Sequence, residues 1–442
     1  MRTTSAWQSI STLALPSIIA GLADPLISMT DTLLVGQINS TAIAGVGLGN
    51  SVITTLIWVL SSIRNAAAGD LAQRHGRDPK TMDEGFVFKV LLAAFLLGLG
   101  AAIITSIAKT SIFSLYHADG ELLTNTLSYY EIRVLGLPFM IGAYTLFGIF
   151  KGYQNTTWAM WLAIGSALMN IGLDLILING ISGYYSGFGI VGAAWASVIT
   201  QILMFTFGII ILWKKVSPII RKVFDFDRRI KMLFVNSFHL AIRTIVLNLA
   251  LILANMYATK SGEASIAAFT VLLNLWLFTA FFLDGFANAG LIVTGNAYGQ
   301  ENWSLINKQV FIVVIVNIGI ATLMGGALLI FRDQFGQLFT DNLAVLEIIS
   351  RTMWLLALTL PFSAIAFSFD GIFLGMSKAK FLRNVLIIST VIFFCPTLFL
   401  TYHYSPQLES VLIAMNAWLF FRALIPLASY IKLSKTNIKA RF

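Results

Sequence analysis

Charged residues are scarce in this chain of 442 residues. Asp, Glu, Lys and Arg together make up 11% of it, whereas 57% of the residues are hydrophobic and the mean hydropathy is +0.83. Soluble globular domains carry about 25% charged residues, so the composition excludes a water-soluble protein and indicates a bilayer as the solvent. A membrane-spanning helix needs about 20 apolar residues, and such stretches fill nearly the whole sequence. No soluble catalytic domain fits between them.

Several chemical motifs are also missing. Cys395 is the one cysteine, so the chain can form neither an intramolecular disulfide nor a thiolate metal cluster. The sequence has no GxxxxGK[ST] run for nucleotide binding, no HExxH pair for zinc and no GxSxG nucleophile motif. These absences argue against an ATP-driven pump and an enzyme, so we expect no catalytic residue, metal or organic cofactor. A selectivity-filter sequence is also lacking, which argues against a channel.

Hydropathy predicts an all-α polytopic membrane protein with twelve transmembrane helices. Lys and Arg test this number, because cytoplasmic loops retain positive charge. Alternate connections hold about 21 Lys and Arg residues on one side and only Lys109, Lys260 and Arg332 on the other. Twelve helices with both termini in the cytoplasm satisfy that asymmetry, and basic loops explain the net charge of +9 without a nucleic-acid partner. The predicted spans are 9–35, 41–69, 86–108, 122–150, 157–179, 188–213, 232–257, 264–295, 307–331, 345–374, 381–402 and 408–431.

The second half of the chain repeats the first at an offset of 223 residues. The run Leu135-Gly-Leu-Pro-Phe139 lies on Leu358-Thr-Leu-Pro-Phe362, and Gly148-Ile-Phe-Lys-Gly152 lies on Gly371-Ile-Phe-Leu-Gly375. Six helices per copy keep both halves in the same orientation, which predicts two pseudo-symmetric six-helix bundles that face a cleft. The predicted domains are an N-terminal six-helix lobe with the cation-coupling site (1–213), a basic cytoplasmic linker (214–231), a C-terminal six-helix lobe (232–431) and a basic cytoplasmic tail (432–442).

Ionisable residues inside the predicted spans are the best functional markers, because each costs about 2.5 to 3.5 kcal/mol on insertion and usually faces a cavity or a partner. Asp24 and Asp31 are seven residues apart and share one face of the first helix. Asn170 and Asp174 are four apart and share a face of the fifth. If Asp31 and Asp174 approach each other in a low dielectric, both cannot carry a charge, so the pair would hold a proton. With Asn170 and the Ser197 hydroxyl, the same oxygens could instead bind Na⁺.

The repeat confines this candidate site to the first lobe. At the offset of 223, the residues opposite Asn170, Asp174 and Ser197 are apolar or uncharged, namely Phe393, Thr397 and Phe420. A polar group that the duplication does not preserve is better explained by function than by a folding requirement.

Other residues in the spans have a structural explanation beside a functional one. Asp370, Arg243 and Asp284 are candidates for a second-lobe site, although Arg243 or Arg422 could simply pair with Asp370. Glu131 and Arg133 cannot face each other at a spacing of two on a helix, so each needs another partner. Two further acids, Asp70 and Asp83, are expected to be solvated in a cytoplasmic loop.

Proline and tyrosine supply the remaining candidates. Pro16 breaks a backbone hydrogen bond in the first helix and is a candidate hinge. Tyr130, Tyr144 and Tyr153 could line a pocket for flat amphipathic molecules together with Asp24, but an aromatic girdle at the interface explains such tyrosines equally well.

Several motifs resemble the multidrug and toxic compound extrusion (MATE) family. The first helix supplies Leu13-Ala-Leu-Pro16, Pro25-Leu26 and Thr30-Asp31-Thr32. The other matching motifs are Gly152-Tyr-Gln-Asn-Thr156, Asn170-Ile-Gly-Leu-Asp174, Gly192-Ala-Ala-Trp-Ala-Ser197, Leu283-Asp-Gly-Phe286 and Ala297-Tyr-Gly299. The last two, with Arg243 before them, look like the DinF branch of the family.

The resemblance implies twelve helices in two bundles and export of diverse, often cationic compounds against an inward flow of H⁺ or Na⁺. Asp31 would be the coupling carboxylate, Asn170 and Asp174 its partners, and Ser197 stands where Thr is frequent. Protonation near Asp31 would bend the first helix at Pro16. Asp370 matches an acid that the sodium-coupled branch uses.

The main hypothesis is therefore a monomeric, proton-coupled multidrug antiporter of the cytoplasmic (inner) membrane. It would export xenobiotic amphipathic compounds by alternating access, with H⁺ as the coupling ion. A Na⁺-coupled antiporter of the same fold is one alternative. A lipid-linked precursor flippase is another, which the acidic interior of the first lobe argues against. An intramembrane enzyme is the last, and no catalytic constellation supports it.

Overall fold

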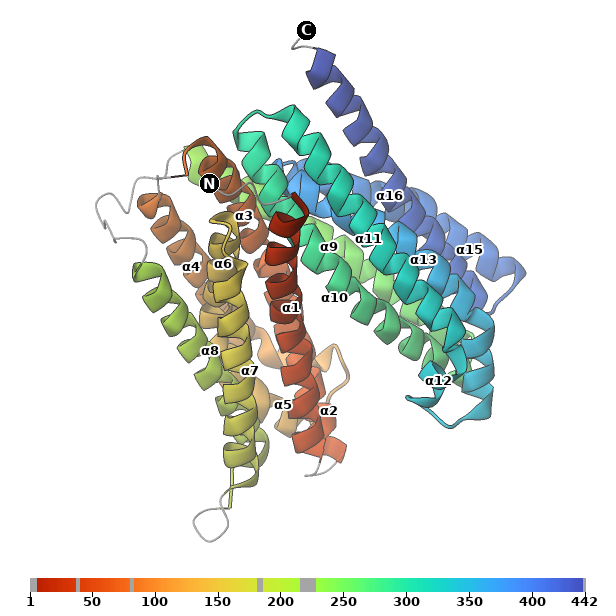
Figure 1. Cartoon of the computed structure of the whole chain (residues 1–442). Helices are drawn as coiled ribbons and strands as arrows, with labels where there is room; N and C mark the ends of the chain where they lie inside the picture. Colours follow the sequence, from red (N-terminus) through yellow and green to blue (C-terminus); the bar gives the residue numbers. More distant parts are fainter. Residues whose placement is uncertain (1–5, 37–39, 80–82, 181–185, 215–227, 440–442) are drawn as a thin grey trace. The chain divides into compact units, whose positions relative to one another are not determined.

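The computed structural model describes residues 6–36, 40–79, 83–180, 186–214 and 228–439. These residues form helices and contain no strand (Figure 1). Side chains of several residues in the first helix, Asp24 and Asp31 among them, lie outside the description. The helices are α1 (Ala6–Gly36), α2 (Ser40–Leu60), α3 (Ser62–Arg77), α4 (Glu84–Ser114), α5 (Gly120–Arg133), η1 (Val134–Gly136), α6 (Leu137–Gly152), α7 (Thr156–Asn179), α8 (Gly189–Trp213), α9 (Arg228–Lys260), α10 (Glu263–Gly299), α11 (Trp303–Ile330), α12 (Arg332–Gln337), α13 (Leu343–Gly375), α14 (Ala379–Ile388), η2 (Ser389–Phe394), α15 (Cys395–Tyr404) and α16 (Leu408–Lys439).

The predicted spans coincide with these helices. Eleven described helical segments are long and apolar enough to cross a membrane, and α1 contributes a shorter apolar stretch, Trp7–Ala23, among its described residues. The predicted all-α polytopic class is confirmed. The second span was predicted to end at residue 69, but α3 continues to Arg77, so Asp70 lies on a helix rather than in a loop.

Asparagine and aspartate side chains begin several of the helices. The carboxylate of Asp83 accepts a hydrogen bond from the Phe86 N–H at 3.2 Å, and Asn155 accepts one from Trp158 at 3.3 Å. Asn302 does the same for Leu305 at 3.1 Å. Such caps satisfy backbone donors that the first helical turn leaves free, and they fix where α4, α7 and α11 start.

The residues divide into two compact units. Unit 1 comprises residues 1–18, 72–77 and 238–442, and unit 2 comprises residues 19–71 and 78–237. In unit 1, α13 packs on α10, α11 and α16, and in unit 2, α4 packs on α6 and α7 on α8 (Figure 1). Three helices, α1, α3 and α9, contribute residues to both units. The predicted linker at 214–231 falls mostly on residues outside the description, so this boundary stays a prediction.

The repeat found in the sequence reappears in the helix boundaries. Adding 223 to the ends of the segment Gly120–Gly152 gives 343 and 375, which are the ends of α13, Leu343–Gly375. The turns that follow also correspond, because Gln154 and Ser377 both adopt left-handed backbone conformations, with φ of 59° and 56°. Both copies therefore begin and end this helical segment at corresponding residues, although the 3-10 turn η1 interrupts it in the first copy and α13 is continuous.

Glycine permits a close helix crossing at corresponding positions of the two copies. In unit 2, a Cβ added at Gly148 of α6 would collide with the carbonyl oxygen of Arg64 in α3. In unit 1, a Cβ at Gly371 of α13 would collide with the carbonyl oxygen of Ala287 in α10. The partners obey the offset as well, since 64 plus 223 is 287. Small residues let helix backbones approach closely where lipid supplies no hydrophobic drive for association.

A second departure from the repeat lies in the helix before α15. Residues 389–394 form the π-helical turn η2, whereas the corresponding residues 166–171 lie within the regular helix α7. Pro396 explains the difference, because its ring lacks an N–H and clashes with the carbonyl group four residues earlier, and a wider turn relieves that clash. The first copy has no proline at the corresponding position, Leu173.

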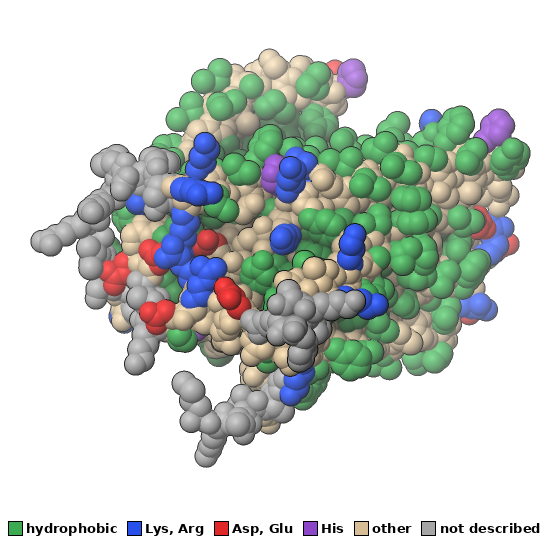
Figure 2. Space-filling model, turned by 90° about the horizontal axis from the view of Figure 1, so that it is seen from above, with side chains coloured by type: hydrophobic (Ala, Val, Ile, Leu, Met, Phe, Trp, Pro, Cys, Tyr) green, Lys and Arg blue, Asp and Glu red, His purple; other side chains and the backbone are tan. Residues whose placement is uncertain are grey.

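Hydrophobic side chains cover much of the visible surface, and Lys and Arg gather in a few patches (Figure 2). Strongly exposed apolar residues include Ile107, Leu323 and Leu343, each more than 70% exposed. Apolar patches of this extent are rare on soluble proteins, and lipid is the solvent that suits them.

We expect Gly371→Ala to destabilise the protein by about 1–3 kcal/mol, because the added methyl group forces α13 away from α10. The matched control is Gly319→Ala in α11, where an added Cβ meets no atom within 4 Å. That change should leave the protein as stable or slightly more stable, since alanine favours helices. The thermal midpoint of tryptophan fluorescence in detergent measures both, and equal midpoints would contradict the close crossing.

Candidate functional site

A hydrogen-bonded polar pair lies inside unit 2. The side chains of Asn170 and Asp174 on α7 are 2% and 0% exposed. The Asn170 amide Nδ2 donates to the Asp174 carboxylate Oδ2, as the spacing of four residues on a helix allows. The amide carries no charge, so this bond orients the carboxylate without neutralising it.

Hydroxyl groups on α8 lie in the same unit. Ser197 and Thr200 are 2% and 3% exposed, and their hydroxyl oxygens have no hydrogen-bond partner among the described residues. Helices α7 and α8 pack side by side. Ser197 was predicted from the sequence and Thr200 was not, although the spacing of three residues places both hydroxyl groups on adjoining turns of α8.

The candidates on α1 are described in part. Asp24 and Asp31 lie on this helix, but their side chains are outside the described set. Pro16 is half-buried, and α1 continues through it. The helix passes from unit 1 to unit 2 between Ile18 and Ile19, two residues after this proline.

Asp370 in unit 1 is held by two arginines. The guanidinium groups of Arg243 on α9 and Arg422 on α16 both donate to the same carboxylate oxygen, Oδ2, with the Arg422 bond at 2.9 Å. Both pairings that sequence analysis offered for Asp370 are therefore present. The guanidinium of Arg422 also lies 5.1 Å from the centre of the Trp418 ring and 5.8 Å from that of Phe367.

Asp284, the third candidate of the second lobe, is exposed on α10 and accepts a hydrogen bond at 2.9 Å from Asn288 one turn later. No hydrogen bond or ion pair among the described residues joins it to the cluster around Asp370.

The three tyrosines lie at different levels along the segment formed by α5, η1 and α6. Tyr130 is fully buried on α5, with its ring edge-on to Phe113 at 5.1 Å. Tyr144 on α6 lies beneath the guanidinium of Arg64 at 5.3 Å. Tyr130 and Tyr153 are 23 residues apart along the α5, η1 and α6 segment, which corresponds to about 34 Å at 1.5 Å per residue.

An ion-pair cluster at the start of α9 corrects one expectation. Asp70 and Asp83, expected to be solvated, both pair with Arg229, whose Nε donates to Asp70 at 2.8 Å. The guanidinium stacks 3.3 Å above the Phe86 ring. Residues 159 and 146 positions apart meet here, so neither spacing nor periodicity could have paired them.

Tyr153 belongs to the same cluster, because its hydroxyl accepts the backbone N–H of Asp83 at 3.2 Å. Burial raises the pKa of Tyr153 to about 12, so the hydroxyl keeps its proton throughout the physiological range.

Glu131 and Arg133 point to different surroundings, as their spacing of two residues requires. Glu131 pairs with Lys109 at the surface. Arg133 is 8% exposed, and its Nε and Nη1 have no hydrogen-bond partner among the described residues.

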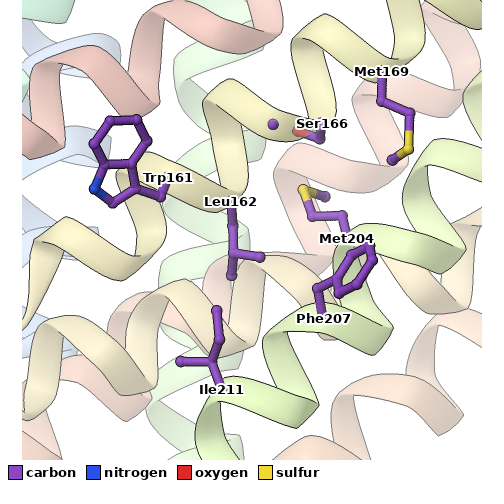
Figure 3. Close-up of a pocket in the computed structure, with 8 residues that line it drawn as sticks. Trp161, Leu162, Ser166, Met169, Met204, Phe207 and Ile211 are labelled. Carbon is purple, nitrogen blue, oxygen red and sulfur yellow. The ribbon is translucent and has the colours of Figure 1, made fainter.

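A shallow pocket of about 340 Å³ lies between α7 and α8 (Figure 3). Its walls are mostly apolar, and Asn170 and Asp174 are not part of them. Trp161 and Phe207 are 62% and 51% exposed, so the pocket opens at the apolar outer surface. The lining residues are Trp161, Leu162, Gly165, Ser166, Met169, Met204, Phe207 and Ile211.

The MatE family model matches residues 16–176 and 240–399, one segment in each copy of the repeat. The chain belongs to the MatE family. This membership confirms the resemblance seen in the motifs, and it identifies a multi-pass membrane protein from a family of transporters rather than enzymes.

Two relatives illustrate the breadth of the MatE family. The chloroplastic protein DETOXIFICATION 44 of Arabidopsis thaliana is 27% identical over 392 residues, which cover 86% of this chain and 74% of that protein. DNA damage-inducible protein F of Escherichia coli (strain K12) is 25% identical over 397 residues, covering 87% and 84%. The DinF-like character inferred from the motifs is thus confirmed.

Solved MATE structures share the fold. A crystal structure of MATE in the bent conformation superposes with a TM-score of 0.91 at 20% identity, covering 99% of this chain and 97% of that one. An outward-facing multidrug resistance MATE family transporter of the MOP superfamily gives a TM-score of 0.88 at 21% identity, with the same coverage.

Arg229→Gln should destabilise the protein by about 1–3 kcal/mol, because it leaves two half-buried carboxylates side by side without their shared cation. Arg229→Lys should recover part of the lost stability. Lysine restores the positive charge, but its ammonium group cannot form the paired hydrogen bonds of a guanidinium group. The neighbouring Arg228 is exposed and serves as the control for removal of one charge. If Arg228→Gln lowers the thermal midpoint as much as Arg229→Gln, the cluster has no special role.

Proposed function

We propose that this MatE-family chain is a proton-coupled exporter of amphipathic, often cationic compounds, and that it works by antiport in the cytoplasmic membrane. The observation that carries the proposal is the carboxylate of Asp174, which is fully buried and hydrogen-bonded by a neutral amide on a helix long enough to span a bilayer. Intramembrane acids in transporters mark ion pathways and proton relays.

A bound cation removes the penalty of this buried charge. A carboxylate in a low dielectric is costly unless it is neutralised, and Asn170 orients the oxygen without neutralising it. Binding of one proton would make the group neutral. A cation that binds Asp174 more tightly in one conformer of the transporter shifts the population towards that conformer.

Asp31 on α1 completes the proposed coupling site, with Ser197 as an additional oxygen. We further propose that α1 bends at Pro16 when this site takes up its cation. The missing backbone hydrogen bond at a proline lowers the cost of bending, and α1 changes from one unit to the other two residues later.

The surroundings of Asp370 argue against a Na⁺ site at this carboxylate. Na⁺ coupling at this position requires a carboxylate free to meet a cation, whereas Arg243 and Arg422 already bring two positive charges to Asp370. Like charges repel strongly at this range in a low dielectric, so a second-lobe Na⁺ site at Asp370 is disfavoured.

The name of one relative supports the proposed class of substrate. The probable multidrug resistance protein YoeA of Bacillus subtilis (strain 168) is 24% identical over 79% of this chain. We propose that both termini lie in the cytoplasm, because the Lys and Arg residues concentrate in alternate connections and in the C-terminal tail. The proposed oligomeric state is a monomer. The two lobes would extend over 1–213 and 232–431, with a basic linker between them.

Asp174→Asn and Asp31→Asn should each abolish ethidium transport driven by a pH gradient in proteoliposomes, because an amide cannot take up and release the coupling proton. Glu131→Gln is the matched control, since Glu131 is an exposed acid paired with Lys109 in the same unit. It should retain transport.

A second arm replaces the pH gradient with a Na⁺ gradient and collapses the proton gradient with an ionophore. Transport that persists under these conditions would establish Na⁺ coupling instead. Undiminished proton-driven transport by both Asn variants, verified as folded by their thermal midpoints, would remove Asp31 and Asp174 from the mechanism.

A further inference from the structure

The cluster around Asp370 carries an excess positive charge inside unit 1. It combines Arg243 from α9, Arg422 from α16 and a single carboxylate from α13. Both arginines donate to the same oxygen of that carboxylate. Two guanidinium groups and one carboxylate leave a net charge of +1 within helices that span the membrane.

Arg422 has unused hydrogen-bonding capacity. It is 2% exposed, and its Nη1 is buried without a hydrogen-bond partner among the described residues. A buried guanidinium nitrogen without an acceptor is costly. The side chains of Arg243 and Asp370 are 16% and 15% exposed, so the cluster remains open on one side.

Two other acids of unit 1 are engaged away from this cluster. Glu409 pairs with Arg351 at 2.7 Å, and Asp284 accepts a hydrogen bond from Asn288 at 2.9 Å. Among the ion pairs of the described residues, Asp370 is the one acid that contacts either Arg243 or Arg422. The protein therefore supplies no second carboxylate from this set to balance the charge.

We propose that Arg243 and Arg422 bind the carboxylate group of a transported amphipathic compound. The inference rests on the proposed transport function and adds a substrate class, namely organic acids and zwitterions that carry one carboxylate. Guanidinium groups bind carboxylates through paired, charge-assisted hydrogen bonds. A single negative charge neutralises the cluster, whereas a phosphate dianion would leave it negative.

Asp370 acts as a positioning residue in this site. Its carboxylate holds two mutually repelling guanidinium groups together before the ligand arrives, and it limits the excess charge to one. Phe367, which is half-buried beside Arg422, offers an apolar surface to the hydrocarbon part of the ligand.

The test compares two dyes that differ at one group. Rhodamine 110 carries a free carboxylate, and rhodamine 123 carries the methyl ester of the same group. Fluorescence anisotropy with the full chain purified in detergent gives the affinity for each, and their ratio isolates the contribution of the carboxylate. The wild-type protein should prefer the acid.

Removing one arginine should remove that preference. Arg243→Gln leaves Asp370 and Arg422 as a neutral pair, so the acid should lose about tenfold or more in affinity while the ester changes little. The double variant Arg243→Gln with Asp370→Asn restores the charge of +1 and should restore the preference for the acid. A merely structural role for the salt bridges predicts no such rescue.

Arg351→Gln is the matched control, because it removes an arginine of unit 1 that pairs outside this cluster. Its acid-to-ester ratio should equal that of the wild type. A wild-type protein that binds both dyes equally, or neither, contradicts the proposal, as does a ratio unchanged in Arg243→Gln. Transport of the ester under a pH gradient is scored separately, so a failure of proton coupling is distinguishable from a failure of this site.

Discussion

The hydrocarbon core of a bilayer offers no hydrogen bonds, and most of this structure follows from that restriction. Backbone polar groups must be satisfied within each segment, which leaves helices as the form for nearly every described residue. Lipid also supplies no hydrophobic drive for helix association, so close backbone approach becomes the means of packing. Gly148 and Gly371 provide that approach in the two copies of the repeat. A charge survives in such an environment only where a partner or a bound ligand neutralises it.

The two copies use the same scaffold to hold opposite charges. Where unit 2 carries Asn170 and Asp174 on α7, the corresponding part of unit 1 has Phe393 and Thr397 together with the π-helical turn before Pro396. Unit 1 instead carries two arginines around Asp370, and the residue opposite Asp370 in the first copy is Phe147. The glycine crossings and the turns at Gln154 and Ser377 stay the same. Duplication has therefore preserved what packs the helices and has let the polar interior diverge.

The sequence was sufficient to predict the helices, the repeat and the local pair on α7. Hydropathy is a property of each segment, and a spacing of four on a helix decides by itself that Asn170 and Asp174 can bond. Contacts between residues far apart in the sequence could not be predicted from hydropathy or helical spacing. Arg229 meets Asp70 across 159 residues, and two arginines rather than one reach Asp370. The sequence suggested a shared pocket only because the residues are all tyrosines. Tyr130 and Tyr153 are separated by about six helical turns along α5, η1 and α6.

The helices shared by the two units differ in stiffness. An uninterrupted α-helix resists bending because its hydrogen-bond ladder is complete, and α3 and α9 contain no proline. In α1, Pro16 removes one rung of the ladder beside the position where the helix changes units. Of these three helices, α1 therefore has the lowest resistance to bending. Bending α1 at this position would break fewer hydrogen bonds than bending α3 or α9, and α1 is also the helix that carries Asp31.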